Sequence, residues 1–89
     1  MSFADKVMVV TGAGGGIGEG YAKRFAKEGM KVCVAEINAE QGQRVADEIN
    51  ADGGTAMFVK VDVSDEQSCL DCGNAVKEAW GKIDYLLNN

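Results

Sequence analysis

The stretch Val7–Gly18 reads VMVVTGAGGGIG and decides the fold of this chain. Lys6–Val10 is a short apolar run rich in β-branched valine, which predicts a strand that ends at a glycine turn. Gly16–Glu28 follows with apolar residues every fourth position, so we expect a helix there. The residues expected on the apolar face of this helix are Ile17, Tyr21 and Phe25.

The rest of the chain alternates between strand and helix patterns in the same way. Short apolar runs predict three more strands, at Lys31–Glu36, Thr55–Val61 and Ile83–Asn88. Strands that alternate with helices form β-α-β units, and right-handed crossovers then give a parallel sheet. We therefore predict an α/β fold, a doubly wound parallel sheet in a three-layer α/β/α arrangement, with the order β-α-β-α-β-α-β.

The two later helices have capping and packing signals of their own. Asn38, with Gln41 three residues on, is a capping box before one of them. Ser64 and Gln67 stand in the same register before the other, which we expect to run through Trp80. The residues expected to cover the sheet are Val45, Ala46 and Ile49 in the first helix and Leu70, Val76 and Trp80 in the second.

Composition and charge exclude several classes of protein. Nine Lys and Arg against fourteen Asp and Glu give a net charge of -5, so we expect no nucleic-acid partner, because a phosphate backbone requires a basic surface. The longest apolar runs, Val7–Val10 and Val32–Ala35, are far shorter than the ~20 residues that span a bilayer, so we expect no membrane partner. No secretory signal opens the chain, which predicts a cytoplasmic protein.

The cysteines indicate neither a metal site nor a disulfide framework. Without His, a Ser-His triad and the usual zinc fingers are impossible. Cys69 and Cys72 form a C-x-x-C pair, but acidic neighbours disfavour a thiolate there. A zinc site would need two further ligands, and the one remaining cysteine, Cys33, lies on a predicted buried strand. We therefore predict reduced thiols and no metal site.

The glycine cluster has the chemistry of a phosphate site. A helix N-terminus presents unpaired N–H groups, and glycines remove the Cβ atoms that would block a pyrophosphate. Spacing alone leaves alternatives open, because Gly12, Gly16 and Gly18 fit the dinucleotide pattern G-x-x-x-G-x-G. Gly12, Gly15 and Gly18 fit a second pattern, G-x-x-G-x-x-G. Gly12, Gly14 and Gly16 also fit the G-x-G-x-G of S-adenosylmethionine binders.

Glu36 narrows these alternatives. It ends the second predicted strand, eighteen residues after Gly18, about where a dinucleotide site places an acid on the adenosine ribose. A carboxylate there accepts hydrogen bonds from both ribose hydroxyls and repels a 2′-phosphate. Neither Gly15 nor Ile37 offers a cation to such a phosphate. We therefore predict NAD as the cofactor and disfavour NADP.

Three motifs in register resemble the short-chain dehydrogenase/reductase family. Thr11–Gly18 resembles its T-G-x-x-x-G-x-G fingerprint, carried by Gly12, Gly16 and Gly18. Asp62-Val63 resembles the D-V pair that follows the third strand, and Leu87-Asn88-Asn89 resembles the start of N-N-A-G. The resemblance covers the whole chain but only the beginning of a family member, and it implies a Rossmann-type fold.

The resemblance also implies a role for each matching residue. The backbone N–H groups of Gly15 and Ile17 would line the pyrophosphate, and Glu36 would hold the ribose. Family members that use NAD more often have Asp at the position of Glu36, but the longer side chain reaches the same hydroxyls.

At the other strand ends, Asp62 would accept from the adenine amino group, with Val63 against the ring. Asn89 would meet the nicotinamide-side ribose, and Asn88 would tie the fourth strand to its neighbours. Thr11 is expected to brace the turn.

The family's catalytic residues have no match here. Its Ser and its Tyr-x-x-x-Lys pair are missing, since Tyr21 and Tyr85 are followed four residues later by Phe25 and Asn89. The chain also ends inside the fourth predicted strand, which would leave a central strand as an open apolar edge. We therefore expect residues 1–89 to be the N-terminal part of a larger dinucleotide-binding domain, with no catalytic residue.

The sequence thus predicts the NAD-binding part of an oxidoreductase that interconverts a small-molecule alcohol and ketone. The resemblance implies a homo-oligomer for the full-length protein. Two alternatives stay open: a stand-alone nucleotide-binding module without catalysis, and a fragment of an S-adenosylmethionine-dependent methyltransferase. Against the second, Val10 stands where those enzymes usually place an acid.

Overall fold

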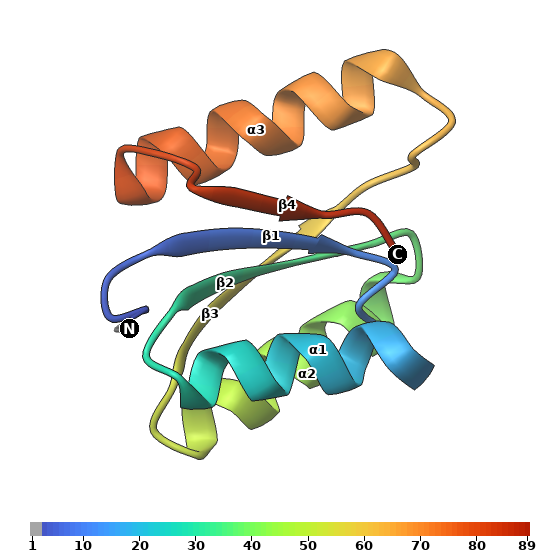
Figure 1. Cartoon of the computed structure of the whole chain (residues 1–89). Coiled ribbons are helices and arrows are strands. Elements are labelled where there is room, and N and C mark those ends of the chain that lie inside the picture. Colours follow the sequence, from blue (N-terminus) through green and yellow to red (C-terminus); the bar gives the residue numbers. More distant parts are fainter. Residues whose placement is uncertain (1–2) are drawn as a thin grey trace.

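The computed structural model describes residues 3–89. Its elements, in chain order, are β1 (Val7–Thr11), α1 (Gly16–Lys27), β2 (Lys31–Glu36), α2 (Ala39–Ala51), β3 (Thr55–Lys60), α3 (Glu66–Trp80) and β4 (Tyr85–Leu87), as Figure 1 shows. The predicted alternation of strands and helices is confirmed. β4 is shorter than the predicted strand at both ends. Just before it, the Asp84 carboxylate accepts from the backbone N–H of Val7 at 2.8 Å, and the Asp84 N–H donates to the Val7 carbonyl at 2.9 Å.

The four strands form one parallel sheet in the order β3-β2-β1-β4. The fourth strand therefore lies beside the first, as predicted. Figure 1 shows α1 and α2 on one face of the sheet and α3 on the other. The three-layer, doubly wound α/β arrangement is confirmed, and it brings the carboxyl ends of all four strands to one edge.

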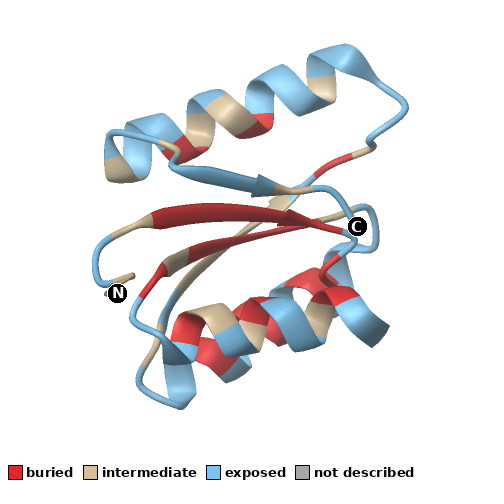
Figure 2. Cartoon of the chain, viewed as in Figure 1, coloured by how far each residue is buried: buried red, intermediate tan, exposed pale blue. Residues whose placement is uncertain are grey.

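Alternation along the central strands divides the core into two clusters. Successive side chains of a strand point to opposite faces, and both faces of β1 and β2 are covered, so both strands are buried almost throughout (Figure 2). The cluster under α1 and α2 includes Met8, Val10, Val32, Val34, Val45 and Ile49. The cluster under α3 includes Val7, Val9, Cys33, Ala35, Cys72 and Val76.

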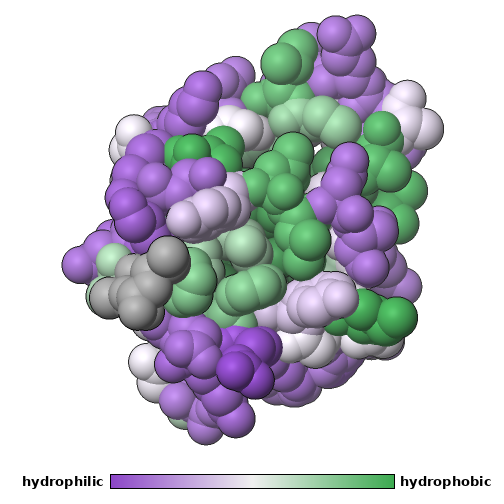
Figure 3. Space-filling model, in the orientation of Figure 1, coloured by the Kyte–Doolittle hydropathy of each residue, from purple (hydrophilic) through white to green (hydrophobic). Residues whose placement is uncertain are grey.

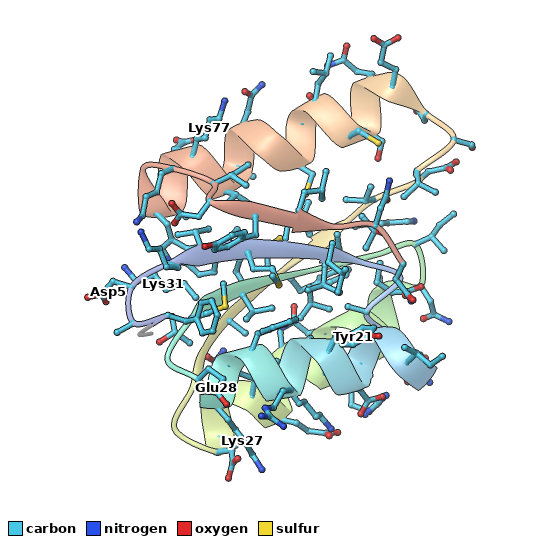
Figure 4. The ribbon with its side chains drawn as sticks, viewed as in Figure 1. Asp5, Tyr21, Lys27, Glu28, Lys31 and Lys77 are labelled. Atoms are coloured by element: carbon cyan, nitrogen blue, oxygen red, sulfur yellow. The ribbon has the colours of Figure 1, made fainter. Side chains whose placement is uncertain are left out.

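The predicted apolar face of α1 is wrong in part. Ile17 and Tyr21 are exposed, and Tyr21 projects from α1 in Figure 4. The buried residues of α1 are Gly18, Ala22 and Ala26. They lie one position later in the chain, about 100° further round the helix, and their small side chains allow α1 to approach the sheet closely.

Two predictions for α3 need correction. Its N-cap is Asp65, whose carboxylate accepts from the backbone N–H of Gln67 at 3.0 Å, and not Ser64. Leu70 is exposed, since it lies about 200° round the helix from Cys72, which faces the sheet with Val76. The predicted cap of α2 is confirmed, because Asn38 accepts from the N–H of Gln41 at 3.1 Å.

β4 forms an exposed edge of the described sheet. Tyr85 and Leu86 are both exposed. Figure 3 shows apolar side chains gathered across the middle of the surface that is turned toward the viewer. The strand pairs only with β1 among the described residues, through Met8, Val9 and Val10. The structure thus has the open apolar edge that the sequence predicts.

Candidate dinucleotide-binding site

The residues predicted to bind a cofactor gather at the carboxyl edge of the sheet. Gly12 follows β1, Glu36 ends β2, Asp62 follows β3, and Asn89 follows β4. The chain moves from β1 outward to β2 and β3, then returns to the other side of β1 with β4. Open α/β sheets bind their ligands outside the strand ends at such a switch point.

The turn between β1 and α1, residues 12–15, is referred to below as the glycine loop. Gly12 has φ +63, a left-handed conformation that favours glycine. A Cβ on Gly18 would lie 2.2 Å from the carbonyl oxygen of Gly12, so α1 can begin this close to β1 only with glycine there. At Gly16, with φ +57, a Cβ would meet open space.

The start of α1 is free to receive an anion. Gly15 is the N-cap, and no side chain of the described residues caps the helix. A Cβ at Gly15 or at Gly16 would have no atom of the described residues within 4 Å, apart from its own neighbours along the chain and the backbone of its own helix. The N-terminal N–H groups and the helix dipole therefore face a space of the kind that a pyrophosphate fills.

Glu36 lies against the glycine loop. Its Oε1 accepts from the N–H of Gly14 at 2.9 Å, and its Oε2 accepts from the N–H of Asn38 at 3.0 Å. A Cβ on Gly14 would be 2.5 Å from Cγ of Glu36, so a larger residue at that position would force the Glu36 side chain to move. The sequence analysis gave Gly14 no role in the dinucleotide site. The signal available in the sequence was Glu36 itself, which is longer than the Asp that family members more often have at that position.

The end of β4 is fastened to the turn after β1. The Thr11 hydroxyl donates to Oδ1 of Asn88 at 3.0 Å and accepts from the backbone N–H of Asn89 at 3.0 Å. Asn89 Nδ2 also lies 3.4 Å from the Gly12 carbonyl oxygen, within hydrogen-bonding distance. These contacts place both asparagines beside the glycine loop, with Thr11 between the two strand ends.

Asp62 and Val63 form the third side of the edge. Oδ1 of Asp62 accepts from the hydroxyl of Ser64 at 2.6 Å and from its backbone N–H at 3.0 Å. These bonds hold the pKa of Asp62 below its usual value, and they explain why Ser64 is not the helix cap. Val63 is 63% exposed, so it offers apolar surface at the edge.

Two hollows differ in their relation to these residues. One, of about 240 Å³, lies between the sheet and α3, and its lining includes Thr11, Val63 and Asn88 from the candidate site. The other, of about 620 Å³, is lined by the last turns of α1 and α2 and by Gly53 and Gly54, at the far end of both helices from the glycine loop. Only the first adjoins the candidate site.

A charge network ties α1 to α2 beside the glycine loop; its members are Glu19, Lys23, Arg44 and Glu48. Glu19 accepts from Lys23 at 2.6 Å and from Arg44 at 2.9 Å. Glu48 accepts from the same two cations at 2.7 and 2.9 Å. Sequence reasoning missed this network, although opposite charges spaced four apart in each helix were a signal.

The charge network gives the stability of the chain a pH dependence. Hydrogen bonds from Arg44 and Lys23 lower the pKa of Glu19 from 4.5 to about 2. Because the folded-state pKa is the lower one, this stabilisation is complete above about pH 4.5 and is lost as the pH falls through about 2. We expect Glu19→Gln to lower the thermal midpoint at neutral pH, by an amount that shrinks between those two values.

Thermal melts followed by circular dichroism measure this effect. Glu66→Gln is the matched control, because Glu66 is an acid in the first turn of α3 just as Glu19 is in α1. The control should shift the midpoint less at neutral pH. A difference between Glu19→Gln and the parent that stays constant with pH would contradict the assignment.

The three cysteines are all free thiols, and they differ in burial. Cys33 and Cys72 are buried, and Cys69 is exposed. The contact with Cys72, together with burial, raises the pKa of the Cys33 thiol. Within residues 3–89 no group of three or more His, Cys, Asp or Glu side chains is placed to hold a metal ion.

Comparisons with known proteins agree with this geometry. The sequence pattern of the family described as short chain dehydrogenase matches residues 6–89. The chain is 45% identical over 89 residues to meso-2,3-butanediol dehydrogenase of Serratia marcescens, and the match covers 100% of this chain and 35% of that enzyme. The chain spans about a third of the length of such curated relatives.

Two solved structures have the same fold. A hydroxysteroid dehydrogenase from Escherichia coli superposes with a TM-score of 0.96 at 38% identity, covering 99% of this chain and 37% of the other. A short chain dehydrogenase/reductase from Burkholderia phymatum in complex with NAD superposes with a TM-score of 0.93 at 35% identity, covering 97% and 31%. No helix within residues 3–89 is both long and apolar enough to span a bilayer.

Proposed function

The chain belongs to the short-chain dehydrogenase family, and from this premise we propose that it is the NAD-binding part of an oxidoreductase that interconverts an alcohol and a ketone. The observation that carries the proposal is the position of Glu36. Its carboxylate lies 2.9 Å from the N–H of Gly14, at the switch point of the sheet and next to the open start of α1. An acid and a free helix N-terminus side by side suit a ribose and a pyrophosphate.

Each matching residue then has a task. The N–H groups of Gly15 and Ile17 bind the pyrophosphate, and a rotation of the Glu36 carboxylate lets it accept from the two adenosine ribose hydroxyls. The open space at Gly16 supports this assignment, since a phosphate could approach the backbone there. Gly12 and Gly18 keep the turn tight enough for α1 to start beside β1.

The other strand ends hold the remaining parts of the dinucleotide. Asp62 accepts from the adenine amino group through Oδ2, the oxygen that the two Ser64 bonds do not use. The exposed Val63 packs against the adenine ring. Asn89, fixed through Thr11, meets the ribose on the nicotinamide side. When bound, the nicotinamide supplies the hydride acceptor or donor.

The reaction class rests on the relatives and not on a catalytic residue of this chain. The relatives are dehydrogenases, and two are named for a diol and for hydroxysteroids, so an alcohol or ketone substrate is the natural proposal. The Ser, Tyr and Lys of the family lack matches within these 89 residues. We therefore propose that the 89-residue chain alone binds cofactor without turnover. We also propose that the full-length protein is a cytoplasmic homo-oligomer.

Cofactor preference tests the proposal most directly at Glu36. We expect Glu36→Gln to reduce the preference for NAD over NADP by about tenfold or more, because it removes the charge that repels the ~-2 charge of the 2′-phosphate while keeping an acceptor oxygen. Calorimetric titration with both dinucleotides measures the ratio of dissociation constants. The control is Glu78→Gln, an exposed acid on α3, which should leave the ratio unchanged. An unchanged ratio in Glu36→Gln would refute the ribose assignment.

A further inference from the structure

The peptide group between Gly14 and Gly15 is held by a side chain from another element. Nη2 of Arg44, on α2, donates to the carbonyl oxygen of Gly14 at 3.2 Å. The N–H of Gly14 donates in turn to Glu36. Both polar groups of Gly14 are therefore engaged by side chains, one from α2 and one from β2.

Peptide geometry transmits this contact to the next residue. The carbonyl of Gly14 and the N–H of Gly15 belong to one planar peptide group and point in opposite directions when it is trans. Holding the carbonyl against Arg44 therefore turns the Gly15 N–H away from Arg44 and fixes its direction. A guanidinium cation on the carbonyl also polarises the peptide, which strengthens the N–H as a donor.

Arg44 is itself held firmly enough to do this. Its Nη1 donates to Glu48 at 2.9 Å, its Nε donates to Gln41 at 2.9 Å, and Nη2 also donates to Glu19 at 2.9 Å. These bonds use the planar fork of the guanidinium, which presents several donors at fixed angles. A lysine has a single nitrogen, and it could satisfy the carboxylates without also reaching the Gly14 carbonyl.

We infer that Arg44 is a positioning residue for cofactor binding, which orients the Gly14–Gly15 peptide so that the Gly15 N–H meets the pyrophosphate. The inference rests on the proposed function, because that function gives the Gly15 N–H its partner. It adds a residue outside the three motifs, which acts through the backbone of the glycine loop and touches no cofactor atom itself.

Two variants separate positioning from stability. Arg44→Lys keeps the positive charge beside Glu19 and Glu48, so we expect a thermal midpoint close to that of the parent but NAD binding about fivefold weaker, the size of one ordinary hydrogen bond. Glu48→Gln weakens two ion pairs of the charge network but leaves Arg44 held by its bonds to Gln41 and Glu19, and the new amide keeps an oxygen that accepts from Nη1. It should lower the midpoint and leave NAD binding within twofold of the parent.

Calorimetric titration with NAD and amide NMR spectra without ligand make the measurement. In the spectra, the Gly15 N–H resonance should move in Arg44→Lys and stay in place in Glu48→Gln. NAD binding as tight in Arg44→Lys as in the parent, or equally weakened in both variants, would overturn the inference. A parent that binds no NAD would instead refute the proposed function, and an unmoved Gly15 resonance in Arg44→Lys would then overturn the inference separately.

Discussion

Gly18→Ala should destabilise the chain by about 3 kcal/mol, at the upper end of the usual penalty for overpacking. The added Cβ would lie 2.2 Å from the carbonyl oxygen of Gly12 and 2.7 Å from Nδ2 of Asn89. The first of these is a backbone atom in the tight turn after β1, so it cannot move aside without displacing the start of α1. Urea denaturation followed by circular dichroism measures the loss.

Gly20→Ala is the matched control, two residues further along the same helix. A Cβ on Gly20 meets nothing within 4 Å, and alanine is about 0.5–1 kcal/mol better than glycine inside a helix. The control should therefore be more stable than the parent. Equal effects of the two substitutions would mean that α1 does not pack closely on the turn at Gly12.

Gly16→Ala should weaken NAD binding by about 100-fold or more while the chain stays folded. The methyl group would project into the space at the start of α1 that we assign to the pyrophosphate, and a blocked phosphate loses several charge-assisted hydrogen bonds, each worth ~1.5–3 kcal/mol. Some backbone strain is also expected, because Gly16 has φ +57. Left-handed backbone costs alanine about 1–2 kcal/mol.

Gly81→Ala separates the strain from the steric block. Gly81 ends α3 with φ +80, and a Cβ there also meets open space, so the same kind of strain arises far from the glycine loop. Both variants should lose similar stability, and only Gly16→Ala should lose NAD binding, as measured by calorimetric titration. If Gly16→Ala bound NAD as well as Gly81→Ala does, the fingerprint would not be the pyrophosphate site.

The fold was predictable because its signals are local. Buried parallel strands such as Val7–Thr11 are short apolar runs, and each turn carries a glycine or a capping residue that the sequence displays. The order of the four strands then follows from the handedness of β-α-β units and from the doubly wound arrangement. The position of Glu36 at a strand end followed from the same pattern.

Side-chain placement within helices was less predictable. Large apolar residues such as Ile17 and Leu70 suggested buried faces, but the structure buries Gly18 in α1 and Cys72 in α3. A pattern of large apolar residues does not show how near a helix lies to its sheet. The close approach of α1 depends on the absence of a side chain at Gly18. A pattern of apolar residues does not identify a position where a missing side chain allows close packing.

The contacts that complete the candidate site join distant parts of the chain. The Arg44 contact with Gly14 spans 30 residues, and the bond from the Asn89 N–H to the Thr11 hydroxyl spans 78. Motif spacing shows which residue types are present but not which side chains meet across α1, α2 and the strand ends. Arg44 was therefore found only in the structure, whereas Glu36 was found in the sequence.

Titration of the parent chain with NAD, NADP and S-adenosylmethionine tests the central claim most directly. We predict saturable binding of NAD, binding of NADP at least about tenfold weaker because Glu36 repels the 2′-phosphate, and no binding of S-adenosylmethionine. Binding of S-adenosylmethionine in place of NAD, or of NADP more tightly than NAD, would contradict the assignment of the glycine loop and Glu36 to an NAD site.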